Sequence, residues 1–258
     1  MILQKTTDLN YLPQRIISVV PSQTELLFDL GLEAETIGIT RFCVHPPYWF
    51  KTKEKIGGTK TIHTDKIHQL QPDLIIANKE ENIKEQIEQL AGNYPIWLTD
   101  VNNLEDALQM ITDIGVLTQK DEAALNISNQ VKQSFKQLKQ AATKTKTAYL
   151  IWRKPYMTIG GDTFINDMLQ QCGFKNIFAH KTRYPEINIE DLQTLNCQLL
   201  LLSSEPYPFI QKHINELQQH LPNTKVVLVN GEMFSWYGSR LLQSAPYIKQ
   251  LIEQINPD

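Results

Sequence analysis

Short apolar segments alternate with longer amphipathic segments along most of the chain. The apolar segments are rich in β-branched residues and are apolar on both faces. Such segments, separated by stretches of helical periodicity, are typical of parallel strands in a sheet that is covered on both sides. The eight candidate strands are residues 16–20, 36–40, 73–77, 95–98, 147–152, 176–178, 198–202 and 225–229. The pattern predicts an α/β fold.

Two of the predicted helices carry start and stop signals. Ser22 and Glu25 form a capping-box pattern at the start of the first helix, and Gly31 ends it. Asp162 is the expected N-cap of the second helix, and Gly173 ends that one.

The two helices belong to two similar halves of the chain. Gly31 and Gly173 each precede a candidate strand and lie 142 residues apart, whereas residues 70–77 match residues 195–202 at an offset of 125. The first half therefore has about 17 additional residues, all between Thr40 and Leu70. Open α/β sheets bind ligands at the carboxyl ends of their strands, where such additional loops lie.

A long amphipathic stretch separates the halves. Residues 121–142 contain no Gly or Pro, and apolar residues recur there at steps of three or four, which predicts one continuous helix. The expected domains are an α/β lobe of residues 1–118, a connecting helix of residues 119–143 and a second α/β lobe of residues 144–258.

Composition excludes several classes of protein. Of 258 residues, 41% are hydrophobic and 21% are charged, and the formal net charge is −3. No basic face indicates a nucleic-acid partner, and no apolar run reaches the roughly 18 residues of a membrane span. The spacing of Cys43, Cys172 and Cys197 indicates neither a disulfide framework nor a zinc site. We expect Cys172 and Cys197 to be buried.

Several stretches resemble class III substrate-binding proteins of ABC importers, also called helical-backbone metal receptors. They are residues 21–25 (PSQTE), 43–47 (CVHPP), 56–60 (IGGTK), 77–82 (ANKEEN), 149–155 (YLIWRKP) and 236–240 (WYGSR). The resemblance covers nearly the whole chain and is closest to the cobalamin-binding branch. It implies two Rossmann-like lobes, each with a parallel sheet flanked by helices, joined by one long rigid helix. It also implies a corrinoid bound between the lobes.

Aromatic residues near the ends of predicted strands suit a large flat ligand. Trp152, Trp236 and Tyr237 offer broad faces with little side-chain freedom to lose; alternatively, they pack within a lobe. Arg153 and Arg240 are candidates to hold amide or carboxylate groups at the rim of a ligand. Salt bridges within a lobe are the competing interpretation for both arginines.

His45 is the candidate metal ligand. Imidazole binds cobalt, iron and zinc, so His45 is expected to coordinate the metal centre of the ligand or a free ion. Cys43 would face the same side if this segment were extended. In the family's periplasmic cobalamin binders the related position resembles Asp-Tyr rather than Val-His. A histidine with a purely structural role in a loop is the alternative.

The remaining candidate ligand-binding residues lie in loops of the first half. Phe42 precedes the CVHPP stretch, and Gly58 and Thr59 form a turn that allows close approach of the backbone. The turn matches no phosphate-binding motif and has an ordinary structural interpretation as well. Lys79, Glu80 and Glu81 open a helix after a strand, where acidic residues are also favoured by the helix dipole alone.

No catalytic constellation is recognisable, so we expect a binding protein rather than an enzyme, with no catalytic cofactor. There is no G-x-S-x-G or H-E-x-x-H motif and no cysteine with an evident base. The other histidines are expected at the surface: His63, His68, His180, His213 and His220. The alternatives to a corrinoid binder are a ferric-siderophore or haem-binding protein, and a cytoplasmic enzyme that acts on corrinoids or tetrapyrroles.

Partners and location follow from the resemblance and from the first residues. Family members dock on a permease through one acidic side chain on each lobe. In the first lobe this chain has Lys84 at or near that position, with Glu81 and Glu85 close by. In the second lobe the corresponding loop contains only Glu232. The resemblance implies an ABC permease as a partner, and the acidic residues at the docking positions depart from the family pattern. The N-terminus shows no export signal, so we expect a cytoplasmic protein, although family members are usually periplasmic or at the cell surface. We also expect a monomer.

Overall fold

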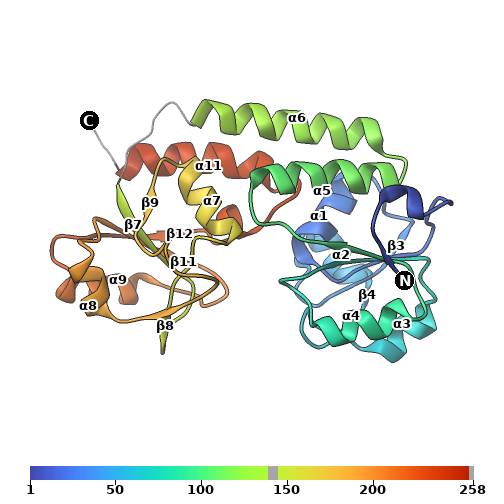
Figure 1. The fold of residues 1–258 in the computed structure, drawn as a ribbon, viewed down its shortest axis with the longest axis horizontal. Coiled ribbons are helices and arrows are strands. Elements are labelled where there is room, and N and C mark those ends of the chain that lie inside the picture. The colour runs from blue at the N-terminus through green and yellow to red at the C-terminus, as the bar shows by residue number, and fades with distance from the viewer. Residues whose placement is uncertain (139–144, 256–258) are drawn as a thin grey trace. The chain divides into compact units, whose positions relative to one another are not determined.

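The computed structural model describes residues 1–138 and 145–255 (Figure 1). The chain divides into two compact units. Unit 1 comprises Met1–Val101, Glu105–Val131 and Tyr237–Arg240, and unit 2 comprises Asn102–Leu104, Lys132–Trp236 and Leu241–Asp258. Unit 1 thus includes four residues from the second half of the sequence. Among the described residues, no helix has the length and apolar character needed to cross a membrane.

Unit 1 is built on a parallel sheet with the strand order β1-β6-β5-β2-β3-β4. Its strands are β1 (Ile2–Leu3), β2 (Ile16–Ser18), β3 (Thr36–Ile39), β4 (Glu54–Lys55), β5 (Leu74–Asn78) and β6 (Ile96–Thr99). Four of them confirm predicted strands. β1 and β4 were not predicted, because a strand of two residues contains no apolar run for the pattern to detect.

Helices cover both faces of this sheet. They are α1 (Pro21–Asp29), α2 (Pro47–Thr52), α3 (Thr64–Leu70), α4 (Lys84–Ala91), α5 (Leu104–Leu117) and the first part of α6 (Asp121–Leu138), with a 3₁₀ turn at Thr6–Asp8. Figure 1 shows α1 and α5 on one face and α3 and α4 on the other. Right-handed crossovers place α1 on the face opposite to α3 and α4, because the chain moves along the sheet in one direction up to β4 and in the other direction after it.

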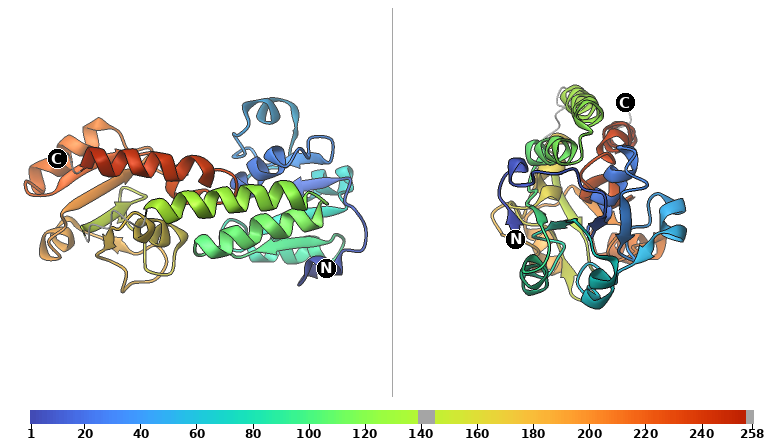
Figure 2. Two further views of the ribbon diagram at one scale, coloured as in Figure 1. Left: turned by 90° about the horizontal axis from the view of Figure 1, so that it is seen from above. Right: turned by 90° about the vertical axis from the view of Figure 1, so that its right-hand side faces the viewer.

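The helix predicted over residues 121–142 is confirmed as α6 as far as Leu138, and residues 139–142 lie outside the described residues. Its apolar positions Ile127, Val131 and Phe135 are buried, as the periodicity predicts. α5 and the first part of α6 lie side by side in opposite directions (Figure 2). A Cβ added to Gly115 would lie 2.4 Å from the Cβ of Ala124, so the close approach of these helices requires glycine there.

Unit 2 contains a parallel sheet with the strand order β12-β11-β7-β9 and a short antiparallel pair of β8 and β10. Its strands are β7 (Lys146–Leu150), β8 (Tyr156–Met157), β9 (Lys175–Asn176), β10 (Glu186–Ile187), β11 (Leu199–Ser203) and β12 (Lys225–Val229). Its helices are α7 (Phe164–Gln171), α8 (Ile189–Thr194), α9 (Gln211–His220), α10 (Glu232–Ser235) and α11 (Leu241–Ile255). The predicted α/β class with parallel sheets flanked by helices is therefore confirmed.

Both predicted helix starts are wrong in their cap residue, whereas both stops are confirmed. α1 begins at Pro21 with Val20 as its N-cap, so Ser22 already lies inside the helix. α7 has Thr163 as its N-cap, and the hydroxyl of Thr163 accepts a hydrogen bond from the amide of Asn166 at 3.2 Å. Asp162 instead accepts a hydrogen bond from the amide of Arg183 at 2.6 Å.

The burial expected for the cysteines and the exposure expected for the histidines are met with one exception. Cys172 and Cys197 are buried, and so is Cys43. Four of the five histidines expected at the surface are exposed: His63, His68, His180 and His220. The exception is His213, which is only 7% exposed.

Replacing Thr163 by Ala should lower the free energy of unfolding by about 1 kcal/mol, because it removes the side-chain acceptor at the start of α7. Asp162→Ala is the matched control, since Asp162 does not cap the helix. Urea unfolding followed by circular dichroism measures both changes. A larger loss in Asp162→Ala than in Thr163→Ala would contradict this assignment of the cap.

Candidate functional site

The candidate residues of unit 1 lie in loops at the carboxyl ends of its strands. Because the sheet is parallel, the loops after β2, β3, β4, β5 and β6 meet at one edge. Two buried asparagines hold three of these loops together. The side-chain oxygen of Asn82 accepts a hydrogen bond from the amide of Asn78 at 2.9 Å. Its amide nitrogen donates to the carbonyl oxygens of Val19 and Thr59, at 3.2 and 3.1 Å.

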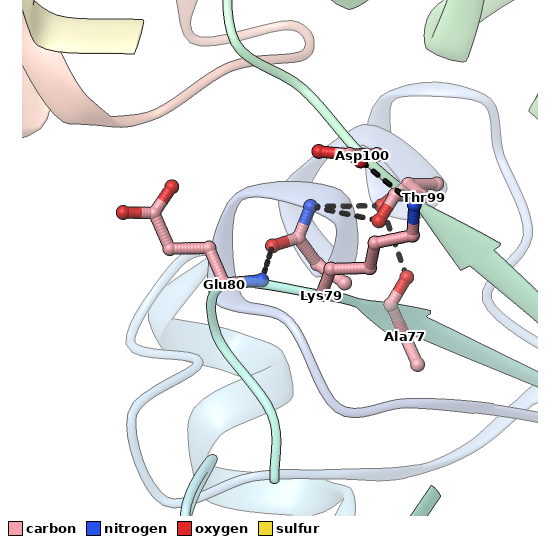
Figure 3. Close-up of polar contacts among 6 residues, drawn as sticks. Ala77, Lys79, Glu80, Thr99 and Asp100 are labelled. Atoms are coloured by element: carbon pink, nitrogen blue, oxygen red, sulfur yellow. Dashed lines mark hydrogen bonds and ion pairs between the residues drawn. The ribbon is translucent and has the colours of Figure 1, made fainter. Parts of the chain in front are cut away.

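Asn78 orders the next residues of the same loop. Its side-chain oxygen accepts hydrogen bonds from the amides of Glu80 and Glu81, at 2.8 and 3.1 Å. Lys79 forms an exposed ion pair of 2.8 Å with Asp100 (Figure 3). In that view the carboxylate of Glu80 points away from the Lys79–Asp100 pair. The two neighbouring side chains therefore present opposite charges in different directions.

The turn at Gly58 and Thr59 supports the aromatic ring of Phe42. Gly57 has a φ of +106°, and a Cβ there would lie 2.3 Å from the carbonyl oxygen of Thr61, so this position requires glycine. A Cβ on Gly58 would lie 3.0 Å from the ring of Phe42. The ring itself remains 50% exposed, with the guanidinium of Arg41 5.2 Å from its centre.

The segment that contains Cys43 and His45 is not extended, so the condition under which the two side chains would face the same side is not met. The amide of Cys43 donates to the carbonyl oxygen of Thr40 at 3.2 Å, so the chain turns here instead of extending. The Cys43 sulfur is buried within 3.1 Å of the hydroxyls of Thr24 and Thr40, and burial raises the pKa of this thiol. His45 is partly exposed. The described residues contain no cluster of three or more His, Cys, Asp or Glu side chains able to hold a metal ion.

Residues Tyr237–Arg240 are attached to unit 1 by a buried ion pair. Arg240 donates from Nε to Glu25 at 2.9 Å, and its NH2 group lies 2.7 Å from the other carboxylate oxygen. Both residues are buried, at 5% and 7% exposed. Burial raises the pKa of Glu25, while the charge and hydrogen bond of Arg240 and the nearby charge of His45 oppose the rise. Arg240 is thus engaged within unit 1.

Tyr237 is buried in the same segment. Its pKa is raised well above the ordinary value, first by burial and then by the charges of Glu81 and Glu80, while hydrogen bonds with Ser22 and Gln23 oppose the rise. The phenol therefore lies among the side chains that start α1 and those that follow β5. Gly238 has a φ of +95° and lies close to the backbone of Ser22. The polar neighbours of Trp236 and Tyr237 in sequence predict exposure, yet both are buried.

In unit 2, Trp152 and Arg153 follow β7. Trp152 is 40% exposed and packs edge-on against Tyr207, with ring centres 5.7 Å apart, so it is not a core residue. Arg153 donates to Glu216 at 2.6 Å. Hydrogen bonds with Tyr156 and Tyr207, and the charge of Glu216, raise the pKa of Arg153. A surface aromatic and a fixed cation are therefore neighbours at the carboxyl edge of this sheet.

Trp236 belongs to a second group of residues in unit 2. Its indole nitrogen donates to Glu205 at 3.0 Å, and the hydroxyl of Ser235 donates to the same carboxylate oxygen at 2.7 Å. Trp236 is 8% exposed. The indole N–H of Trp236 is therefore bound to the carboxylate of Glu205, in the loop that follows β11.

The structure groups the candidate residues into two sets. Unit 1 contains Phe42, His45, Gly58, Thr59, Lys79, Glu80, Glu81, Tyr237 and Arg240, and unit 2 contains Trp152, Arg153 and Trp236. Sequence reasoning missed the partners that hold them in place, namely Glu25, Tyr207 and Glu205. Glu25 was interpreted as part of a helix cap, and no sequence signal links it to Arg240, which lies 215 positions away.

Similarity to known proteins extends over most of the chain. A model of the periplasmic binding protein family matches residues 16–227. The vitamin B12-binding protein of Pectobacterium carotovorum is 26% identical over 253 residues, covering 95% of this chain and 91% of its own length. The vitamin B12-binding protein of Photorhabdus laumondii is 28% identical over 249 residues, covering 95% and 88%.

Solved structures show the same fold. The periplasmic vitamin B12 binding protein of Vibrio cholerae matches with a TM-score of 0.82 at 20% identity, covering 95% of this chain and 99% of its own. The periplasmic haem-binding protein of the same organism matches with a TM-score of 0.80 at 18% identity, covering 95% and 99%. At 20% and 18% sequence identity, these structural similarities establish the fold alone.

Replacing Arg240 by Met should destabilise the protein strongly at pH 8, by about 3 to 5 kcal/mol, because Glu25 is left buried without its counter-charge. The loss should shrink at pH 5. A carboxyl group whose pKa is raised by folding takes up a proton on folding, so its cost falls as the pH falls toward and below that pKa. Urea unfolding at the two pH values measures the change.

Lys66→Met is the matched control, because Lys66 pairs with Glu54 at the surface at 2.6 Å. Exposed pairs contribute about 0 to 1 kcal/mol. A loss in Arg240→Met that is as small as the control, or that does not depend on pH, would contradict the role given to the Glu25–Arg240 pair.

Proposed function

The chain belongs to the periplasmic binding protein family, and we propose that its ligand is a corrinoid, either cobalamin or a precursor. The observation that carries this proposal is an exposed aromatic ring at the carboxyl edge of each parallel sheet. Phe42 in unit 1 and Trp152 in unit 2 are 50% and 40% exposed. Relatives that cover most of this chain are named vitamin B12-binding proteins, which supports a corrinoid over other flat ligands.

The surroundings of the two rings suit the chemistry of a corrinoid. A corrin ring is broad and apolar on its faces and carries amide groups at its rim. Phe42 and Trp152 offer faces for the ring, and charged groups near each aromatic can hydrogen-bond amides. Arg41 lies over Phe42, and Arg153 follows Trp152. Each unit therefore combines an apolar face with a polar rim.

Isothermal titration with cyanocobalamin should give saturable binding near one ligand per chain. Phe42→Ala and Trp152→Ala should each weaken it by about tenfold to a hundredfold, the range expected for losing 1.5 to 3 kcal/mol of buried aromatic contact. Tyr11→Ala is the control, because Tyr11 is 46% exposed and contacts Asp73, at the amino end of β5. Equal affinities in all four proteins would contradict the proposed site.

His45 is proposed to coordinate the metal that the ligand carries. The described residues contain no cluster able to hold a free metal ion. A single imidazole can instead fill one open coordination position of a metal that a macrocycle already holds.

Hydroxocobalamin has a displaceable axial group, so its visible spectrum should shift on binding to the wild-type protein. His45→Ala should bind cyanocobalamin with little change but lose the hydroxocobalamin shift. Absorption titrations with both corrinoids measure this. A spectral shift that survives in His45→Ala would show that the imidazole does not reach the cobalt.

The same titrations separate the competing classes of ligand. Haemin and ferric chelates serve as the alternatives, because the fold is shared with a haem-binding protein. Tight binding of haemin without binding of any corrinoid would move the assignment to iron ligands.

We also propose binding without turnover, so the bound corrinoid should be recovered unchanged after incubation and denaturation.

Delivery to an ABC permease is part of the proposal, with Glu85 in the first turn of α4 and Glu232 at the start of α10 as the contacting acids. Lys84 carries the opposite charge, and its Nζ lies 3.7 Å from Oε1 of Glu88.

The family is periplasmic, and we assign the protein to that side of the membrane or to the cell surface instead of the cytoplasm. Cell fractionation tests this location directly.

A further inference from the structure

His213 is a buried histidine whose ring is enclosed by aromatic neighbours. It is the third residue of α9, and its Nδ1 accepts a hydrogen bond from the amide of Ile210 at 3.0 Å. The rings of Tyr207 and Phe209 lie with their centres 5.5 Å from the imidazole. This hydrogen bond satisfies a backbone donor at the helix start, as a Gln or Glu does at the same position of a capping box.

The contacts require the neutral imidazole. An Nδ1 that accepts a hydrogen bond carries no proton, so the hydrogen is on Nε2, which lies 3.4 Å from the hydroxyl of Tyr207. Burial lowers the pKa of His213, and the positive charges of Arg153 and Lys212 lower it further, while Glu216 opposes them. The N-terminus of α9 adds positive potential from the helix dipole.

His213 is connected to the proposed ligand-binding residues through Tyr207. Tyr207 packs edge-on against Trp152, with ring centres 5.7 Å apart, and hydrogen-bonds Arg153. Arg153 is in turn paired with Glu216, one turn beyond His213 on α9. Through Tyr207, the loop of residues 204–210 therefore contacts both the imidazole and the ring of Trp152.

We propose that His213 is a positioning residue that makes corrinoid binding sensitive to pH: the neutral imidazole holds the 204–210 loop beneath Trp152 and Arg153, and its protonation releases that loop. This inference rests on the proposed function of the same site. The geometry predicts weaker binding at lower pH. A protonated Nδ1 cannot accept the hydrogen bond from Ile210, and the imidazolium is repelled by Arg153. A histidine kept neutral by folding stabilises the structure above its ordinary pKa near 6.5, and the contribution is lost as the pH falls below that value.

His213→Gln tests the proposal, because glutamine at this position can accept from the Ile210 amide at every pH. Cyanocobalamin is the probe, since cyanide occupies its axial position and His45 then does not contribute. Between pH 7.5 and 5.5 the wild-type protein should lose at least threefold in affinity, whereas His213→Gln should stay nearly constant. His220→Gln is the matched control, since His220 is exposed at the other end of α9, and it should behave as the wild type.

The Ile210 amide gives a readout that does not depend on any ligand. Its protection against hydrogen exchange, measured relative to an unstructured amide at the same pH, should fall below pH 6.5 in the wild type and in His220→Gln, but not in His213→Gln. Equal pH profiles in all three proteins, or an imidazole that titrates at its ordinary pKa with no change at Ile210, would overturn the inference. Absence of corrinoid binding at pH 7.5 with a pH-dependent Ile210 amide would instead overturn the proposed function alone.

Discussion

The buried ion pair between Glu25 and Arg240 is the interaction on which the candidate site of unit 1 depends. It joins α1 to four residues from the far end of the sequence, and these residues place the Tyr237 phenol among the side chains after β5. Two charges taken out of water are tolerated only when each satisfies the other with good geometry. Here both carboxylate oxygens meet the guanidinium, at 2.9 and 2.7 Å. The pair therefore specifies where the segment attaches, whatever its net contribution to stability.

The parallel sheets explain why the functional candidates are confined to loops. Strands such as β5 and β11 are buried along their whole length, so they have no face to offer a ligand. Polar and aromatic side chains can gather only where the strands end. The resulting edge is assembled from loops that are far apart in sequence, and asparagines at positions 78 and 82 satisfy the backbone groups that these loops expose to one another.

Much of the fold could be predicted from local patterns, because each signal lies within one element. Apolar runs marked the seven strands that are longer than two residues, and the steps of three or four marked α6. The cap residues of α1 and α7 were misplaced by one or two positions, since Ser22 and Asp162 have the right chemistry beside the true starts. Burial of His213 was missed because its enclosing rings, Tyr207 and Phe209, are brought onto it by a turn that no periodicity describes. Pairs such as Glu25–Arg240 depend on the completed tertiary structure and leave no trace in composition or spacing.

The amide of Asn82 has a consequence for how this protein can change over evolution. Its two donor hydrogens are both used, one on the loop after β2 and one on the turn at Thr59. A residue inserted into either loop would pull its carbonyl oxygen away and leave a buried donor without an acceptor. The lengths of these loops are thus coupled to one another, and new ligand preferences should arise by exchange of side chains at fixed loop length sooner than by insertion or deletion.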